Sequence, residues 1–179
     1  MRIHFSKFHT FILVLLILVV IFDQVTKIAA IKYLKGRPGI HFPESWTPHD
    51  LFRLTYTENT GAFLSLGSQL PDTLRFWLFI VLNSVVLLIL FILIFYKEDL
   101  PFVTMISFTL IISGGLGNII DRVFRDGKVV DFMNMGIGFD SFSLRTGIFN
   151  VADLAIVFGL VLLLIGEFIV FGTATSRPN

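Results

Sequence analysis

Four aspartates are the residues with which this sequence could do acid–base chemistry: Asp23, Asp121, Asp131 and Asp153. The last of them opens an unbroken apolar run in IFNVADLAIVFGLVLLL, residues 148–164, where a buried carboxylate needs a partner to replace its lost solvation. Two carboxylates within hydrogen-bonding reach cannot both ionise cheaply, so they share one proton and titrate as a pair. Such a pair can activate water for attack on an amide carbonyl, without a metal ion, serine, cysteine or histidine.

Each acid also has a purely structural interpretation. Asn150 and Asp153 fit a helix start, with Asn150 as the N-cap and an acid in the first turn, where the helix dipole favours negative charge. Asp131, in GKVVDFMNMG, follows a short β-like run and taken alone is a surface acid. Asp121 and Arg122 end an apolar run, where they could form an interfacial charge pair with a snorkelling arginine.

Two further motifs indicate structure rather than chemistry. Asp23 and Lys27 are four residues apart in the order that favours an ion pair, so we interpret them as a simple pair at the membrane edge. The glycines of SGGLGNII, residues 113–120, predict close helix packing. They do not form a dinucleotide fingerprint, because no strand precedes them and the third glycine is missing.

The composition indicates a polytopic membrane protein. The chain of 179 residues is 55% hydrophobic and 15% charged, with a mean hydropathy of +0.84. Its net charge is +1 and its basic residues are spread along the chain, so nothing indicates nucleic-acid binding. The chain has no cysteine, and its four histidines lie within the first fifty residues, so neither a metal site nor a catalytic triad is indicated.

Hydropathy predicts one integral membrane domain over 1–179, with helices near 8–30, 74–96, 100–121 and 151–172. The first could be a cleaved signal peptide, but its polar end lacks a small-x-small cleavage site, so we expect a retained helix. With four crossings, both termini share one side of the membrane. The loops over 31–73 and 122–150 share the other side.

The first of these loops contains LFRLTYTENTGAFLSLG, residues 51–67, which alternates, turns at 58–61 and alternates again. This pattern predicts a β-hairpin at the membrane surface or against the bundle. Together the two loops gather a layer of acids and amides at one end of the bundle: Asn59, Asn118, Asp121, Asp131, Asn150 and Asp153. Such a layer indicates acid–base chemistry on a membrane-derived substrate or a proton pathway.

Two other classes of protein are alternatives to a hydrolase. A small proton-coupled carrier would use the same acids as a relay, but it would need acids spaced through the membrane. Here only Glu167 lies toward the other side. A non-catalytic assembly subunit would use the acids as helix caps and ion pairs.

Five blocks of the sequence together resemble the lipoprotein signal peptidase family, the bacterial signal peptidase II: FDQVTK (22–27), ENTGAFLSLG (58–67), GGLGNIIDRV (114–123), GKVVDF (127–132) and FNVAD (149–153). The resemblance implies a membrane aspartic peptidase of four transmembrane helices with an extracytoplasmic β-hairpin or cradle. It further implies a multi-pass location in the bacterial cytoplasmic (inner) membrane, with both termini cytoplasmic and the active site near the outer face. The count of lysines and arginines alone would place the termini outside.

The resemblance also implies that Asp131 and Asp153 are the catalytic pair, without metal or cofactor. The residues at positions that shape the family's site are Asn59, Gly61, Asn118, Arg122, Asn150, Asp23, Lys27 and Asp121. The implied substrate is a prolipoprotein whose cysteine carries diacylglycerol, cut before that cysteine; membrane lipid and the inhibitor globomycin are the other expected partners, and a monomer suffices. One departure is visible, since four residues separate Arg122 from Gly127 where the family pattern has three.

Overall fold

The computed structural model describes residues 7–43, 51–62, 66–97, 100–139 and 142–175. Its helices are α1 (Lys7–Leu34), the consecutive α2 (Asp72–Phe76), η3 (Trp77–Leu82) and α3 (Asn83–Tyr96), then α4 (Phe102–Phe124) and α5 (Val151–Thr175). Four stretches are long and apolar enough to cross a membrane: Phe8–Leu34, Asp72–Tyr96, Phe102–Phe124 and Val151–Phe168. The predicted class, four membrane helices with a small β element, is therefore confirmed.

Helix α4 is the central helix of the bundle. Of the residues in its apolar 18-residue stretch, 56% are buried, against 17%, 11% and 17% in the other three membrane helices. Those three helices direct most of their side chains outward toward lipid. Small residues allow this central position: a Cβ on Gly115 would lie 2.6 Å from Leu87 Cδ1, and one on Gly117 would lie 2.5 Å from Asp23 Oδ2. The close packing predicted from SGGLGNII is confirmed.

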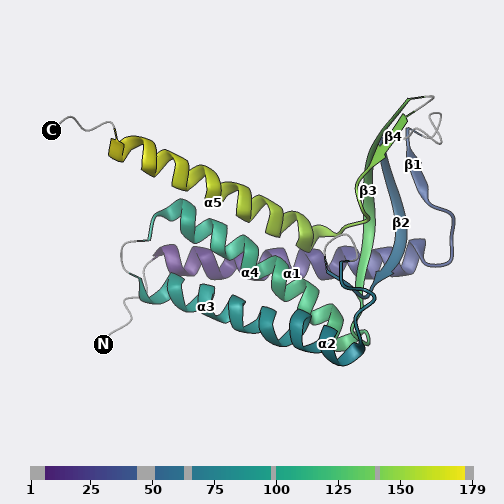
Figure 1. The fold of residues 1–179 in the computed structure, drawn as a ribbon, viewed down its shortest axis with the longest axis horizontal. Helices are drawn as coiled ribbons and strands as arrows, with labels where there is room; N and C mark the ends of the chain where they lie inside the picture. Colours follow the sequence, from purple (N-terminus) through teal and green to yellow (C-terminus); the bar gives the residue numbers. More distant parts are fainter. Residues whose placement is uncertain (1–6, 44–50, 63–65, 98–99, 140–141, 176–179) are drawn as a thin grey trace.

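A four-stranded antiparallel sheet lies at one end of the bundle (Figure 1). Its strands are β1 (Ile40–Phe42), β2 (Phe52–Asn59), β3 (Val129–Phe139) and β4 (Phe142–Arg145), in the order β1-β2-β3-β4. The last turns of α1 pack on it, with Ala30 and Leu34 against Val130 and Phe132. Because successive side chains of a strand point to opposite faces, Asp131 points away from this apolar cluster.

The second half of the hairpin predicted within residues 51–67 includes residues 63–65, which lie outside the described part. In the described part, strand β2 pairs with β1, as Ile40 with Leu54, and with β3, as Asn59 with Val129. After Asn59 the chain turns, and the Ala62 N–H donates to the Leu66 carbonyl (2.7 Å); residues 63–65 lie outside the described part. Alternation identifies an extended segment but not its partner, and here the partner comes from the loop after α4.

Both loops lie at the same end of the bundle (Figure 1). Helix α1 begins, and α5 ends, at the opposite end from the sheet. The last turn of α4 and the first turn of α5 therefore both lie beside β2 and β3. This arrangement gathers the predicted acids and amides.

Candidate active site

Asp131 and Asp153 are held by the amide groups of three asparagines. In β3, Asp131 accepts hydrogen bonds from Asn59 Nδ2 (3.0 Å) and Asn150 Nδ2 (2.6 Å), one on each oxygen. At the start of α5, Asp153 accepts from Asn118 Nδ2 (2.9 Å) and from the backbone N–H of Asn150 (3.1 Å). Asn150 donates to both carboxylates, so the fold brings together two acids that are 22 residues apart in the sequence.

Asn150 also begins α5, as the sequence predicts. Its Oδ1 accepts from the Asp153 N–H (2.9 Å), while its own N–H donates back to Asp153 Oδ2. This reciprocal pair is a capping box, which satisfies free N–H groups at the helix start. The structural interpretation of Asn150 and Asp153 is confirmed, and the chemical one is compatible with it, because the cap fixes the position of the Asp153 carboxylate.

Lys27 contacts two acids and one of the asparagines that hold the Asp131 and Asp153 pair. It is fully buried, and its Nζ lies 2.9 Å from Asp23 Oδ2, 3.2 Å from Asp121 Oδ2 and 3.0 Å from Asn118 Oδ1. The predicted pair of Asp23 and Lys27 is confirmed, but it is not a simple pair at the membrane edge. Because its third contact orients the Asn118 amide, Lys27 directs the other end of that amide toward Asp153.

The two acids bound to Lys27 connect the helices to one another and to the sheet. Asp23 accepts from the Ala152 N–H (2.9 Å) in α5, and Asp121 accepts from the Val130 N–H (2.9 Å) in β3. Gln24 completes the cluster, since its Nε2 lies 3.1 Å from both Asp23 Oδ2 and Asp121 Oδ1. The sequence analysis did not select Gln24, although it lies inside the FDQVTK block.

Arg122 is buried, and the predicted snorkelling arginine is wrong. Only 7% of Arg122 is exposed; its Nη2 donates to the Gly61 carbonyl (2.7 Å) and its Nη1 to the Asn118 carbonyl (3.4 Å). Gly61 in turn donates its N–H to Asn59 Oδ1 (2.8 Å). Arg122 therefore joins the turn after β2 to α4 and holds Asn59 beside Asp131.

The environment of Asp131 is suited to holding a proton. Only 2% of this residue is exposed, and its burial, with the nearby charge of Asp153, raises its pKa to about 7. The amide hydrogen bonds of Asn59 and Asn150 act in the opposite direction. Asp153 is half-buried, so it is the member of the pair that solvent reaches. Among the described residues, no group of three or more His, Cys, Asp or Glu could hold a metal ion.

The fold and this site define a polytopic membrane protein with an acid–base centre at one end of its helices. A solved bacterial membrane enzyme, determined in meso at 2.3 Å resolution, matches 99% of this chain and 98% of its own with a TM-score of 0.71 and 30% identity. A second, at 1.9 Å resolution, matches 93% and 97% with a TM-score of 0.69 and 28% identity.

The family described as Signal peptidase (SPase) II matches residues 15–169. A lipoprotein signal peptidase of Borrelia garinii subsp. bavariensis is 36% identical over 167 residues, 92% of this chain and 94% of the relative. Another, from Borreliella afzelii, is 34% identical with the same coverage. The chain belongs to the signal peptidase II family, and it is a multi-pass membrane peptidase of the aspartic class.

These comparisons and the placement of the acids do not favour a proton-coupled carrier. Asp23, Asp121, Asp131 and Asp153 are joined within one hydrogen-bonded cluster at the sheet end of the bundle. A relay would need acids spaced along the helices. In the described part of α5 the remaining acid, Glu167, is exposed and distant from that cluster in the sequence.

Proposed function

We propose that this peptidase removes the signal peptide from prolipoproteins whose cysteine carries diacylglycerol, cutting immediately before that cysteine. The observation that carries the proposal is the convergence of Asp131 and Asp153 on Asn150. The printed names of the relatives, lipoprotein signal peptidases, supply the substrate class.

In the proposed reaction the two acids share one proton and hold a water molecule. The ionised acid takes a proton from the water as its oxygen attacks the carbonyl carbon, while the neutral acid donates its proton to the carbonyl oxygen. The tetrahedral intermediate then breaks its C–N bond. The nitrogen receives a proton from the acid that took one from water, while one hydroxyl of the intermediate returns a proton to the other acid. The products are a carboxyl group on the signal peptide and an amine on the cysteine, and the pair again shares one proton.

We assign the resting proton to Asp131 and the ionised role to Asp153. A pKa of about 7 keeps Asp131 largely protonated in mildly acidic conditions and about half protonated at neutral pH. Asp153 accepts one backbone and one side-chain N–H, both of which stabilise a carboxylate, and it is half-buried rather than fully buried.

We further propose that both termini lie in the cytoplasm and that the sheet end lies near the outer face of the inner membrane. A lipidated substrate is confined to the membrane, so its scissile bond arrives at a fixed depth. Asp153 lies in the first turn of α5 rather than at mid-helix, which matches a bond at the boundary between headgroups and hydrocarbon. We expect the enzyme to act as a monomer.

The test is cleavage of a diacylglyceryl-modified precursor by purified wild-type protein and by the Asp131→Asn and Asp153→Asn variants. We expect each variant to lower kcat/KM by about 10³-fold or more, because each removes a group that transfers a proton in the reaction. Glu167→Gln is the matched control, since it removes an exposed acid at the other end of α5. The unlipidated precursor should not be cleaved.

Substantial turnover by either aspartate variant would refute the catalytic pair. Thermal unfolding in detergent should show that both variants remain folded, so that lost activity reports chemistry. Activity should also withstand chelators and serine-directed reagents and be inhibited by globomycin. Proton flux across liposomes without any peptide substrate would instead support the carrier.

A further inference from the structure

Basic side chains gather on one side of the sheet end, where α1 ends and β3 begins. We call this group the basic patch, and all of its members are exposed or partly exposed: Lys32, Lys35, Arg37 and Lys128. Lys35 and Lys128 lie close together, because both contact the carboxylate of Glu58 (2.9 Å each). Lys32 lies one helical turn before Lys35. Arg37 follows α1 directly, since its N–H donates to the Leu34 carbonyl (3.1 Å).

The basic patch carries more positive charge than its contacts neutralise. Two of its lysines share the single carboxylate of Glu58. No ion pair to Lys32 or Arg37 is found among the residues that the structure describes. Four positive charges therefore face one negative charge, and the proposed reaction assigns them no role.

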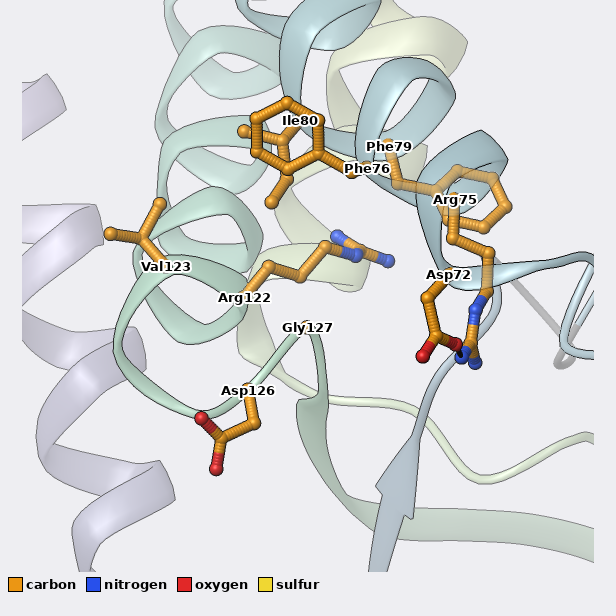
Figure 2. A pocket seen from close by; sticks show the side chains of 9 residues that line it. All are labelled: Asp72, Arg75, Phe76, Phe79, Ile80, Arg122, Val123, Asp126 and Gly127. Carbon is orange, nitrogen blue, oxygen red and sulfur yellow. Dashed lines mark hydrogen bonds and ion pairs between the residues drawn. The ribbon is translucent and has the colours of Figure 1, made fainter.

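The opposite side of the sheet end, formed by α2 and the end of α4, has a different charge balance. Figure 2 shows a cavity there of about 400 Å³, with Arg75 and Asp72 next to each other on its wall. These two residues form an ion pair, and Asp126, also on the wall, is exposed. Arg122 is buried and bonded to two backbone carbonyls. Positive charge is therefore offset on this side and left in excess on the side of α1.

The basic patch continues a lipid-facing stripe of α1. Five apolar residues of this helix are more than half exposed and recur at the three- and four-residue spacing of one helix face: Leu18, Ile21, Phe22, Val25 and Ile28. The next positions on that face are Lys32 and Lys35, which lie about 6 and about 10 Å beyond Ile28 along the helix axis. The two lysines therefore lie where the lipid-exposed face of α1 leaves the hydrocarbon.

Tyrosine side chains lie at the same level of the helix. Tyr33 is 55% exposed, and Lys32 Nζ lies 5.2 Å from the centre of its ring. Lys35 Nζ lies 5.2 Å from the centre of the Tyr56 ring. Tyrosines of membrane proteins gather where headgroups meet hydrocarbon, and lysines near helix ends extend their ammonium groups into the headgroups. The basic patch therefore faces lipid headgroups rather than the protein interior.

We propose that the basic patch binds the phosphate groups of anionic phospholipids, such as phosphatidylglycerol, at the end of the bundle that carries the active site. Each lysine or arginine near an anionic membrane surface strengthens binding by about fivefold, whereas a zwitterionic headgroup has no net charge to attract. This binding gives a role to basic residues whose count runs against the proposed orientation. The inference concerns the bilayer and not the substrate, so it is tested separately from the proposed function.

The first test measures lipid preference by electron paramagnetic resonance. Protein in phosphatidylcholine bilayers receives a trace of spin-labelled phosphatidylglycerol or spin-labelled phosphatidylcholine, and the motionally restricted fraction gives the preference for the anionic lipid. We expect wild type to prefer phosphatidylglycerol and the double variant Lys32→Gln, Lys35→Gln to lower that preference by about threefold or more. The double variant Lys32→Arg, Lys35→Arg keeps the charge and should keep the preference.

Two further variants test where the charge must lie and with what sign. Arg75→Gln removes a positive charge from the same end of the bundle but outside the basic patch, so the preference should change less than about 1.5-fold. Glu58→Gln leaves Lys35 and Lys128 without their shared counter-charge, so the preference should rise. An unchanged preference in the folded lysine-to-glutamine variant, or a fall in Glu58→Gln, would overturn the inference.

The second test locates the lipid on the wild-type protein. Phosphatidylglycerol with a diazirine on its headgroup is photolysed with the protein in phosphatidylcholine nanodiscs, and the labelled peptides are mapped by mass spectrometry. We expect labels within 28–37 and 125–128. Labels confined to the other end of the bundle would overturn the inference. Loss of labelling on addition of millimolar glycerol 3-phosphate would mean that the patch binds soluble phosphates, and it would overturn the inference as well.

Discussion

Two pairs of acids lie at the same end of this bundle, and they differ in what holds them. Asp23 and Asp121 are fully buried and both contact the ammonium of Lys27. Asp131 and Asp153 contact amide groups, and no ion pair to either is found in the described part of the chain. All four carboxylates accept hydrogen bonds, so hydrogen bonding alone does not distinguish one pair from the other.

The difference lies in the kind of group that contacts each pair. The ammonium of Lys27 attracts carboxylates directly and holds Asp23 and Asp121 in place. Neutral amides stabilise a carboxylate less and leave burial and mutual repulsion to raise its pKa, as at Asp131. The same residue type can therefore serve two purposes. The pair in contact with lysine forms a rigid scaffold, and the pair without lysine can hold a transferable proton.

The largest effect should follow loss of the cation. Lys27→Met leaves Asp23 and Asp121 buried without their counter-charge, so we expect a loss of about 3 to 5 kcal/mol of stability. Thermal unfolding in detergent, followed by tryptophan fluorescence, measures it. Lys32→Met is the control on an exposed part of the same helix and should unfold like wild type. Wild-type stability of Lys27→Met would show that the two clusters do not differ as described.

The next effect concerns the pH dependence of stability at the amide-held pair. The pKa of Asp131 rises from 3.8 to about 7 on folding, so between these values the folded state keeps a proton that the unfolded state has lost. Stability should therefore fall as pH rises through this window, by at most about 1.4 kcal/mol per pH unit, and level off above it.

Asp131→Asn removes this titration. Its stability relative to wild type should rise with pH between about 4 and 7, since an amide carries no proton to lose. Unfolding temperatures measured across this range for wild type, Asp131→Asn and the control Glu167→Gln give the comparison. Parallel curves for wild type and Asp131→Asn would mean that the folded carboxyl is ionised over the whole range.

A smaller effect tests how closely the scaffold is packed against its helices. Gly117→Ala would place a Cβ 2.5 Å from Asp23 Oδ2 and 3.3 Å from Ala152 Cβ, so the Asp23 carboxylate must leave its position beside Lys27 and Ala152 must give by a few tenths of an ångström. We expect a loss of about 1 to 3 kcal/mol, typical of overpacking. Gly166→Ala is the control at the other end of α5, where the nearest atom, Val103 Cγ1, would lie 3.3 Å away and needs to give by only a few tenths of an ångström. Equal thermal shifts for both variants would contradict the argument.

The sequence predicts best what depends on neighbours along the chain. Membrane helices follow from long apolar runs, the cap of α5 from Asn150 and Asp153, and the ion pair of Asp23 and Lys27 from their spacing of four residues. Each of these features needs only one helix. The layer of acids and amides also followed from counting crossings, because an even number places both loops at one end.

The sequence predicts less well what depends on contacts between distant segments. The pairing of β2 with β3 joins residues about seventy positions apart, and alternation contains no information on that choice. Arg122 looks like a snorkelling residue at a helix end, and only the turn at Gly61 shows that it is buried. In the sequence, Gln24 is only another polar residue near a charged pair. Its contact with Asp121 is formed only when α1 packs against α4.

The smallest effect should come from a further acid, Glu58, whose lysine partners are exposed. Glu58 accepts hydrogen bonds from Lys35 and Lys128 (2.9 Å each) and from Tyr56 (2.8 Å), and these contacts lower its pKa to about 2. Their stabilisation is present above the ordinary pKa of 4.5 and is lost as pH falls toward 2, so it operates at neutral pH.

Exposed ion pairs nevertheless contribute little, so Glu58→Gln should lower the unfolding temperature at neutral pH by at most about 2 °C. The shift should shrink in 1 M salt, because the Debye length there is only about 3 Å. Glu167→Gln should show no salt-dependent difference from wild type. A shift as large as that of Lys27→Met would mean that burial is not what gives the Lys27 cluster its strength, since both clusters pair lysine with carboxylate and differ chiefly in their access to water.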